Sequence, residues 1–254
     1  PKEHLIPVHY QSQEEFRGGI QAAAEHARTF CKTVDISTSG PITTKVRMVD
    51  KTYLRKLFEI HYTGQNVENP RPITGGYDCI VLADFGHGAV TPDTVRDIYA
   101  TGTYLALDVQ TNSANIGFNL VTKYARADYI VIDEPEARLA AADRDGPIEC
   151  VVKHLATGRC KKMVVTLGNR GAIGYEDGRF YHAPAMSRNV VDVMGAGDAF
   201  FAVTAPMART GGMDDLLLIG NAAGALKTQI VGHRESVTKE ALITFIKEYH
   251  GKSC

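Results

Sequence analysis

The chain has 254 residues, with 28 basic and 29 acidic side chains and a formal net charge of -1 at pH 7. This balance argues against a nucleic-acid binder, which typically shows a basic excess. The hydrophobic share of 44% is sufficient for a full core, and no apolar run reaches the ~18 residues that a membrane helix needs. We therefore expect a cytoplasmic globular protein whose partners include neither nucleic acid nor a membrane.

The five cysteines and nine histidines show no spacing typical of a metal site or a redox motif. We expect incidental thiols in a reducing compartment and no structural zinc. The chain begins with Pro1 rather than methionine, and its first residues do not resemble a secretory signal. A fragment or a processed product is therefore expected.

The first third of the chain contains an Ala-rich helix and a hairpin. Residues 5–10 are expected to be extended, residues 14–31 helical and residues 33–37 a short strand. Residues 43–49 and 53–62 have the pattern of two antiparallel strands joined by a turn.

From residue 77 onward, short apolar runs alternate with helical segments. Four strands are expected, at residues 79–83, 104–107, 129–132 and 162–166. Helices are expected between and after them, at residues 91–101, 119–125, 135–142, 148–156, 196–209, 216–229 and 238–249. This alternation predicts an α/β fold with a parallel, doubly wound sheet flanked by helices. A further hairpin is expected at residues 171–175 and 178–182, across the turn Asp177-Gly178.

Polar residues end the expected parallel strands. Ligands of such sheets bind at the carboxyl ends of the strands. Each side chain alone could instead be a helix cap, but four together favour a site at this edge. The four residues are Asp84, Asp108, Asp133 and Thr166.

A glycine loop precedes the helix that starts near residue 196. Gly195, Ala196 and Gly197 would leave backbone N–H groups free at the positive end of the helix dipole, which favours an anion. Asp198 follows immediately. Its carboxylate could cap the helix, or it could act as a base beside a transferring phosphoryl group.

These segments resemble the PfkB, or ribokinase-like, family of carbohydrate kinases. Residues 192–198 are similar to the family signature, and Gly18-Gly19 is similar to the pair that opens an Ala-rich helix. Residues 164–171 resemble the nucleotide-binding turn, and residues 133–136 resemble the motif tied to metal and phosphate. The resemblance implies a ribokinase-like sheet with a small β lid, and ATP and Mg²⁺ as cofactors.

The resemblance also implies roles for individual residues. Asp198 would be the base, and Gly195, Ala196 and Gly197 would stabilise charge on the phosphoryl group. Glu136 and Asp133 would hold Mg²⁺ through water. Asp192 would help to bind a monovalent cation such as K⁺, or would only cap the loop.

Further residues would bind the two substrates. The nucleotide would contact Thr166, Gly168, Gly171, Asn221 and Gly224. The sugar would contact Gly18, Gly19 and Asp84. Lys45 and Arg47 are candidates for a substrate phosphate, with solvated strand charges as the alternative.

Three positions depart from the family pattern. Ala22, with Gln21 beside it, replaces an asparagine that touches the sugar, Val193 replaces a threonine, and Asp133 replaces an asparagine. No strand with a sugar-binding aspartate precedes Gly18. We therefore expect that the chain lacks its natural N-terminus and a stretch near residues 40–41. The polar loop after Asp108 could contact sugar or a partner domain, or could be a plain solvent loop.

The resulting expectation is a single kinase domain over residues 1–254. Its lid would comprise residues 1–12 and 41–63, and its main lobe residues 13–40 and 77–254. It would transfer the ATP γ-phosphoryl group to a hydroxyl of a sugar or sugar phosphate.

The segments at residues 1–8, 43–47 and 82–88 are similar to the heptose-phosphate kinase branch, which is often fused to a nucleotidyltransferase. A homodimer joined through the lid is expected. One alternative is a catalytically degenerate domain that serves a fused transferase as a scaffold. A dinucleotide-binding oxidoreductase is disfavoured, because no G-x-G-x-x-G turn follows the first strand.

Overall fold

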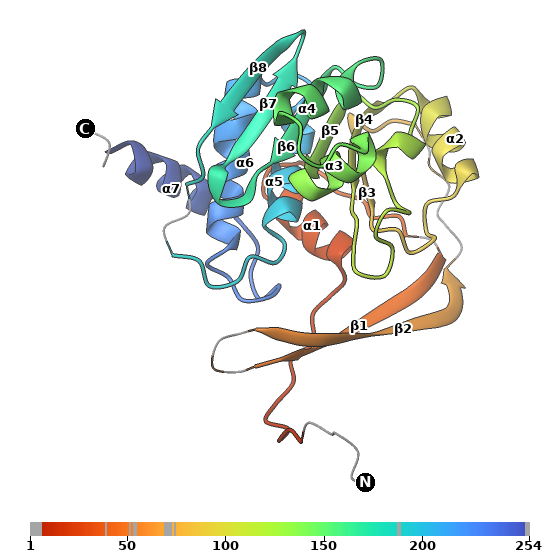
Figure 1. Ribbon diagram of the computed structural model, residues 1–254, viewed down its shortest axis with the longest axis vertical. Helices are drawn as coiled ribbons and strands as arrows, with labels where there is room; N and C mark the ends of the chain where they lie inside the picture. Colours follow the sequence, from red (N-terminus) through yellow and green to blue (C-terminus); the bar gives the residue numbers. More distant parts are fainter. Residues whose placement is uncertain are drawn as a thin grey trace.

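The computed structural model describes residues 7–38, 40–50, 52, 55–68, 73, 75–186 and 189–251. A six-stranded mixed sheet lies between two layers of helices, and a separate two-stranded ribbon lies beside this main body (Figure 1). Within the described ranges, none of the helices combines the length and the apolar character that a bilayer crossing requires.

The sheet has the strand order β3-β4-β5-β6-β7-β8. Its first four strands are parallel, and β7 and β8 form an antiparallel hairpin at one edge. Asp177 and Gly178 both have positive φ angles, 48° and 82°, as the two-residue turn of a twisted hairpin requires. The strands are β3 (Cys79–Asp84), β4 (Tyr104–Val109), β5 (Tyr129–Asp133), β6 (Lys162–Thr166), β7 (Ala172–Glu176) and β8 (Arg179–Ala183).

Helices cover both faces of this sheet, because the central strands carry apolar side chains on both sides. Successive residues of a strand point to opposite faces. In β5, Ile130 and Ile132 therefore join the core under α2 (Pro92–Thr101), α3 (Glu134–Ala141) and α4 (Ile148–Ala156). Tyr129 and Val131 join the core under α5 (Ala196–Thr204) and α6 (Met213–Lys227). The expected flanked α/β sheet is confirmed.

Two more helices complete the layer that contains α5 and α6. The helix α1 (Gly19–Arg28) packs against α5, and α7 (Lys239–Gly251) packs against α6. Small side chains make the first contact close, since Ala23, Ala24 and Ala27 of α1 are all buried. This packing brings Gly18 and Gly19 near the N-terminal end of α5.

The ribbon consists of β1 (Gly40–Val49) and β2 (Lys56–Glu68), paired antiparallel as the sequence predicts. Lys45 is opposite His61, and Arg47 is opposite Glu59, so these four side chains share one face. The ring of His61 makes an edge contact with that of His87 in the loop after β3. The charged face of the ribbon is therefore turned toward the main body.

Two expected elements are wrong. Residues 33–37 form no strand, and the sheets of the described residues do not include them. Residues 119–125 contain only the 3-10 turn η1 (Val121–Lys123). The amide of Asn119 donates to the carbonyl groups of Asp84 and Gln110, which competes with helix formation. Residues 7–12 belong to neither ribbon strand, and residues 1–6 lie outside the described residues.

Candidate active site

A cleft lies between the ribbon, α1, the carboxyl ends of the parallel strands and the start of α5. Its volume is about 2960 Å³, larger than the ~300–1,000 Å³ of a typical small-ligand pocket. It has room for two ligands side by side. Most of the predicted site residues line it: Gly18, Gly19, Lys45, Arg47, Asp84, Asp133, Glu136, Thr166, Asp192, Gly195, Gly197 and Asp198.

The start of α5 supplies free backbone donors to this cleft. The first main-chain bond of the helix type runs from the N–H of Ala199 to the carbonyl of Gly195, at 2.9 Å. The N–H groups of Gly197 and Asp198 precede it and lie at the positive end of the helix dipole. Gly195 has a φ of 77°, a left-handed conformation that favours glycine. This turn can accept an anion.

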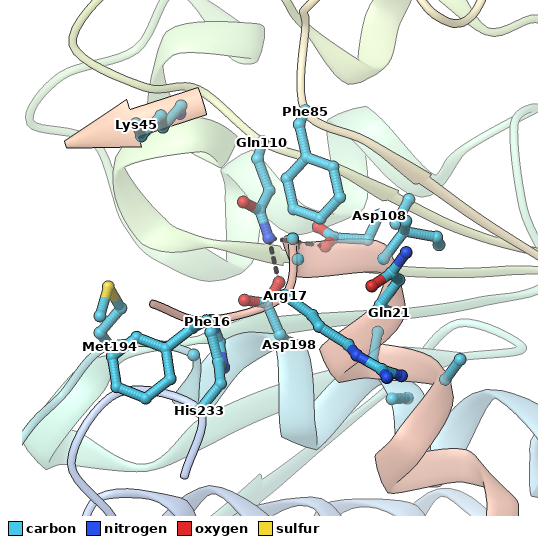
Figure 2. A pocket seen from close by; sticks show the side chains of 18 of the residues that line it. Phe16, Arg17, Gln21, Lys45, Phe85, Asp108, Gln110, Met194, Asp198 and His233 are labelled. Atoms are coloured by element: carbon cyan, nitrogen blue, oxygen red, sulfur yellow. Dashed lines mark hydrogen bonds between the residues drawn. The ribbon is translucent and has the colours of Figure 1, made fainter. Parts of the chain in front are cut away.

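Asp198 is held by an amide from a neighbouring strand end (Figure 2). The side chain of Gln110 donates from Nε2 to Asp198 Oδ1 and, at 3.0 Å, to Asp108 Oδ2. Burial raises the pKa of Asp198, while the hydrogen bond from Gln110 opposes the rise. Burial, followed by the charges of Asp198 and Glu136, raises the pKa of Asp108 well above its usual value. A carboxylate with a raised pKa is a better proton acceptor than an ordinary aspartate.

Asp133 and Glu136 form a capping box at the start of α3. Asp133 Oδ1 accepts from the N–H of Glu136, and Glu136 Oε2 accepts from the N–H of Asp133, both at 2.8 Å. The other oxygen of Glu136 accepts from the N–H of Thr111 at 2.8 Å. Burial and then the charge of Asp133 raise the pKa of Glu136 to about 7.

This carboxylate pair fits Mg²⁺ only through water. Among the residues that the structure describes, no group of three or more His, Cys, Asp or Glu side chains is arranged to hold a bare metal ion. Mg²⁺ commonly keeps several waters and uses one or two carboxylates. Asp133 is exposed at the cleft, while the oxygens of Glu136 already accept backbone N–H groups.

Asp84 lies at the cleft, but both oxygens of its carboxylate interact with other residues of the protein. Its carboxylate accepts from the hydroxyl of Tyr124 at 2.6 Å and from the N–H of Gly86 at 3.0 Å, and it forms an ion pair with Lys123. The residue is 3% exposed. Its contacts hold the turn that places Phe85 over Gly19, where an added Cβ would lie 2.8 Å from the ring. The structure thus gives Asp84 an anchoring role, and a sugar contact stays a prediction.

The two basic residues of β1 differ in their surroundings. Arg47 is paired with Glu59 at 2.5 Å, so its charge is already matched. Lys45 is half-buried on the ribbon above the cleft (Figure 2). Burial lowers its pKa, while the charge of Glu59 opposes that effect. Lys45 is the better of the two candidates for an anionic ligand.

The predicted nucleotide residues are divided between two places. Thr166 ends β6 inside the cleft. Gly168 begins the 3-10 turn η2 (Gly168–Arg170) and Gly171 follows it, and the described lining of the cleft includes neither. A Cβ at Gly171 would overlap the carbonyl oxygen of Ala183.

Asn221 and Gly224 lie on α6, and the described lining of the cleft includes neither. Asn221 donates to the carbonyl of Pro184 at 3.1 Å, which ties α6 to the segment after β8. A Cβ at Gly224 would lie 3.4 Å from the carbonyl oxygen of Ala196, so this glycine serves the close approach of α6 and α5. The structure therefore explains both residues by packing, and their nucleotide role stays a prediction.

Asp192 caps two loops. Its oxygens accept from the N–H groups of Met194 and Gly232, both at 3.0 Å. Burial raises its pKa, but these hydrogen bonds, together with the charges of Lys56 and Lys227, lower the pKa overall. The carbonyl oxygens of the same two residues accept from the ammonium group of Lys227 at 2.9 and 2.7 Å. The carbonyl groups beside Asp192 thus already accept from a lysine side chain, and the structure gives Asp192 the capping role.

The sequence analysis did not identify two residues of this site. Gln110 bridges the two carboxylates (Figure 2), and Lys227 donates to the carbonyl groups beside Asp192. Gln21, noted beside Ala22 in the sequence, lines the cleft. A signal existed for Lys227, because it is the one basic residue in the apolar run of α6. For Gln110, its place two residues after a strand-ending aspartate was the available signal.

Known proteins support this reading of the fold. Residues 112–240 match the model of the pfkB family of carbohydrate kinases. The bifunctional protein HldE of Geobacter metallireducens is 28% identical over 162 residues, which cover 61% of this chain and 32% of the relative. The chain therefore spans about a third of the length of such relatives.

Solved structures are similar over a comparable part of the chain. The ribokinase of Arabidopsis thaliana, complexed with ribose and ATP, has a TM-score of 0.52 and 21% identity, covering 61% of this chain and 51% of its own. Phosphofructokinase-2 of Escherichia coli, in complex with potassium, has a TM-score of 0.58 and 16% identity. This similarity covers 70% of the present chain and 59% of the phosphofructokinase chain. These neighbours establish a ribokinase-like fold.

Proposed function

The chain belongs to the pfkB family of carbohydrate kinases, and from this premise we propose that it transfers the γ-phosphoryl group of ATP to a sugar hydroxyl. The observation that carries the proposal is the position of Asp198. Its carboxylate lies at the start of α5, beside free backbone N–H groups, in a cleft with room for two ligands. A base and an anion site in one place are what phosphoryl transfer to a hydroxyl requires.

The chemistry follows from these groups. Asp198 accepts the proton of the sugar hydroxyl as the oxygen attacks the γ-phosphorus and the bond to ADP breaks. The N–H groups of Gly197 and Asp198 stabilise the charge on the transferring group without reorganisation. Asp133 and Glu136 would hold Mg²⁺ through water, and the bound ion would neutralise charge on the ATP phosphates. The ribbon covers the sugar and excludes water, which limits ATP hydrolysis.

The proposed acceptor is a heptose phosphate. Relatives named bifunctional protein HldE match most of the chain, in agreement with the resemblance to the heptose-phosphate kinase branch. Lys45, on the cleft side of the ribbon, is the cation that would meet the substrate phosphate. A nucleotidyltransferase, fused or associated, would then use the phosphorylated product.

A homodimer is proposed on the basis of the outer face of the ribbon. Met48, Phe58, Ile60 and Tyr62 share this face, and each is at least 36% exposed. A contiguous apolar surface of this kind typically marks a contact with another protein. A second copy of the chain would bury it against the same face of its own ribbon.

One observation favours a second function, a degenerate kinase domain that acts as a scaffold. The amide of Gln110 covers one oxygen of Asp198, and Asp84 has protein partners for its carboxylate. In this alternative, the cleft would still bind nucleotide or sugar, without transfer.

The test is ADP release from ATP against a panel of sugars and sugar phosphates that includes heptose 7-phosphate. We expect turnover with one acceptor class, and a loss of ~10²-fold or more in Asp198→Asn. Asp215→Asn is the matched control, because Asp215 is likewise in the first turn of its helix but lies on an exposed surface. Binding of ATP without turnover on any acceptor would instead support the scaffold.

A further inference from the structure

Lys227 ends the helix α6 with its side chain directed into the protein. The residue is 0% exposed, although lysine is almost never fully buried without partners. Its Nζ donates to three backbone carbonyl groups, those of Gly232 at 2.7 Å, Met194 at 2.9 Å and Ile230 at 3.4 Å. The three hydrogens of the ammonium group therefore have three acceptors.

The partners of this ammonium group are carbonyl oxygens, and none of the described ion pairs includes Lys227. Burial lowers the pKa of Lys227, while the nearby charges of Asp192 and Asp198 oppose that effect and favour the ammonium form. The carboxylate of Asp192 binds the N–H groups of Met194 and Gly232, whose carbonyl groups hold Lys227. The two loops thus form a cage with oxygen atoms inside and an aspartate beside it.

A cage of backbone carbonyl oxygens is the arrangement that replaces the hydration shell of a monovalent cation in proteins. A lysine ammonium is a compact point charge of the same sign. We propose that Lys227 is a built-in monovalent cation, which takes the place of a bound K⁺ and sets the position of the anion-binding turn at the start of α5.

The contact with that turn is direct. A Cβ at Gly195 would lie 3.3 Å from Cε of Lys227, so the stem of the lysine packs against the turn. Its Nζ also fixes the carbonyl of Met194, the residue before Gly195. Lys227 is therefore a positioning residue, which acts on phosphoryl transfer through the loop. This effect on turnover rests on the proposed function, whereas the cation cage does not.

The first experiment compares thermal unfolding in choline, K⁺ and NH₄⁺ chlorides at equal ionic strength. We expect the wild-type protein to unfold at the same temperature in all three salts. Lys227→Ala should lower the unfolding temperature in choline by about 5 °C or more, because three buried carbonyl groups lose their donor. K⁺ or NH₄⁺ should restore at least half of this loss, since each can enter the vacated cage.

Lys162→Ala is the matched control. Lys162 is also largely buried, and its Nζ donates to the carbonyl groups of Ala208 and Gly211 at 2.9 and 2.6 Å, which follow the C-terminal rather than the N-terminal end of α5. We expect this variant to lose stability without recovery in any particular salt, because its ammonium group also pairs with Glu176 and sits in no such cage.

A wild-type protein that is stabilised by K⁺ over choline would overturn the proposal, and this outcome needs no variant to fold. A fall in the unfolding temperature of Lys227→Ala that neither K⁺ nor NH₄⁺ reverses would also overturn the proposal. Where turnover is measurable, Lys227→Ala should lose about 10-fold or more in choline and regain activity in K⁺. An enzyme without any sugar turnover would contradict the proposed function and leave the unfolding result to decide on the cage.

Discussion

The side-chain amide of Gln110 donates hydrogen bonds to two carboxylates, those of Asp108 and Asp198. Its Nε2 donates to both Asp108 and Asp198, so the negative charges share a donor in a region of low solvent access. The backbone of Gln110 is held separately, by a bond from its N–H to the carbonyl of Asp84 and by the amide of Asn119. The side chain can therefore be changed without releasing the loop.

We expect Gln110→Leu to move the pH dependence of turnover. The hydrogen bond from Gln110 lowers the pKa of Asp198, so its loss raises that pKa further. A base is active only when deprotonated, and a higher pKa means that activity is lost at a higher pH as the solution is acidified. The acidic limb of kcat/KM should shift to higher pH in the variant.

Thr111→Val is the control for this measurement. Thr111 lies in the same loop and donates its hydroxyl to the carbonyl of Asn119, but it does not contact Asp198. The acidic limb of kcat/KM in Thr111→Val should coincide with that of the wild type. An unchanged limb in Gln110→Leu, or an equal shift in both variants, would show that Gln110 does not tune the base.

At the scale of elements, the helices α5 and α6 pack closely because of a glycine. A Cβ at Gly220 of α6 would overlap the ring of Phe200 on α5. One end of each helix lies at the active site: α5 starts there at Ala196, and α6 ends there at Lys227. The distance between the helices therefore also sets where Lys227 meets the turn at Gly195.

We expect Gly220→Ala to destabilise the protein by about 1–3 kcal/mol, the usual cost of adding atoms to a packed contact. Chemical unfolding measures this loss. Gly251→Ala is the control, because this helical glycine has no atom within 4 Å of the added Cβ and alanine favours helix. Equal stability of Gly220→Ala and the wild type would contradict the packing explanation.

At the scale of the whole molecule, the ribbon presents two different faces. The charged face, with Lys45 and Glu59, is turned toward the main body, and the opposite face is apolar and exposed. A two-stranded ribbon alone is only marginally stable in water. Burial of its outer face in a dimer would stabilise it in the position that covers the cleft.

We expect the double substitution Phe58→Lys and Ile60→Lys to convert a dimer into a monomer. These side chains are 54% and 36% exposed and share the outer face. The molar mass from light scattering measures the change. Phe118→Lys is the control, since Phe118 is 92% exposed but lies in the loop before η1. A wild-type protein with the mass of a single chain would exclude the dimer.

Local signals in the chain were enough to predict many of its helices and strands. Apolar runs alternating with helical segments predicted the order of strands and helices from β3 onward, because burial on both faces leaves a pattern within each strand. The antiparallel ribbon and the turn Asp177-Gly178 were likewise predictable from neighbouring residues. Asp198 and its glycine loop were found because the motif is continuous in the chain.

Features that depend on residues distant in the chain became visible in the folded protein alone. Residues 33–37 have a strand pattern, yet they belong to neither sheet of the described residues. Asp84 is an anchor because Tyr124 reaches it from 40 residues away. Gln110 and Lys227 acquire their roles from contacts with Asp198 and Met194, 88 and 33 residues away. A buried polar group must find a partner wherever the fold provides one, and no local pattern encodes which partner that will be.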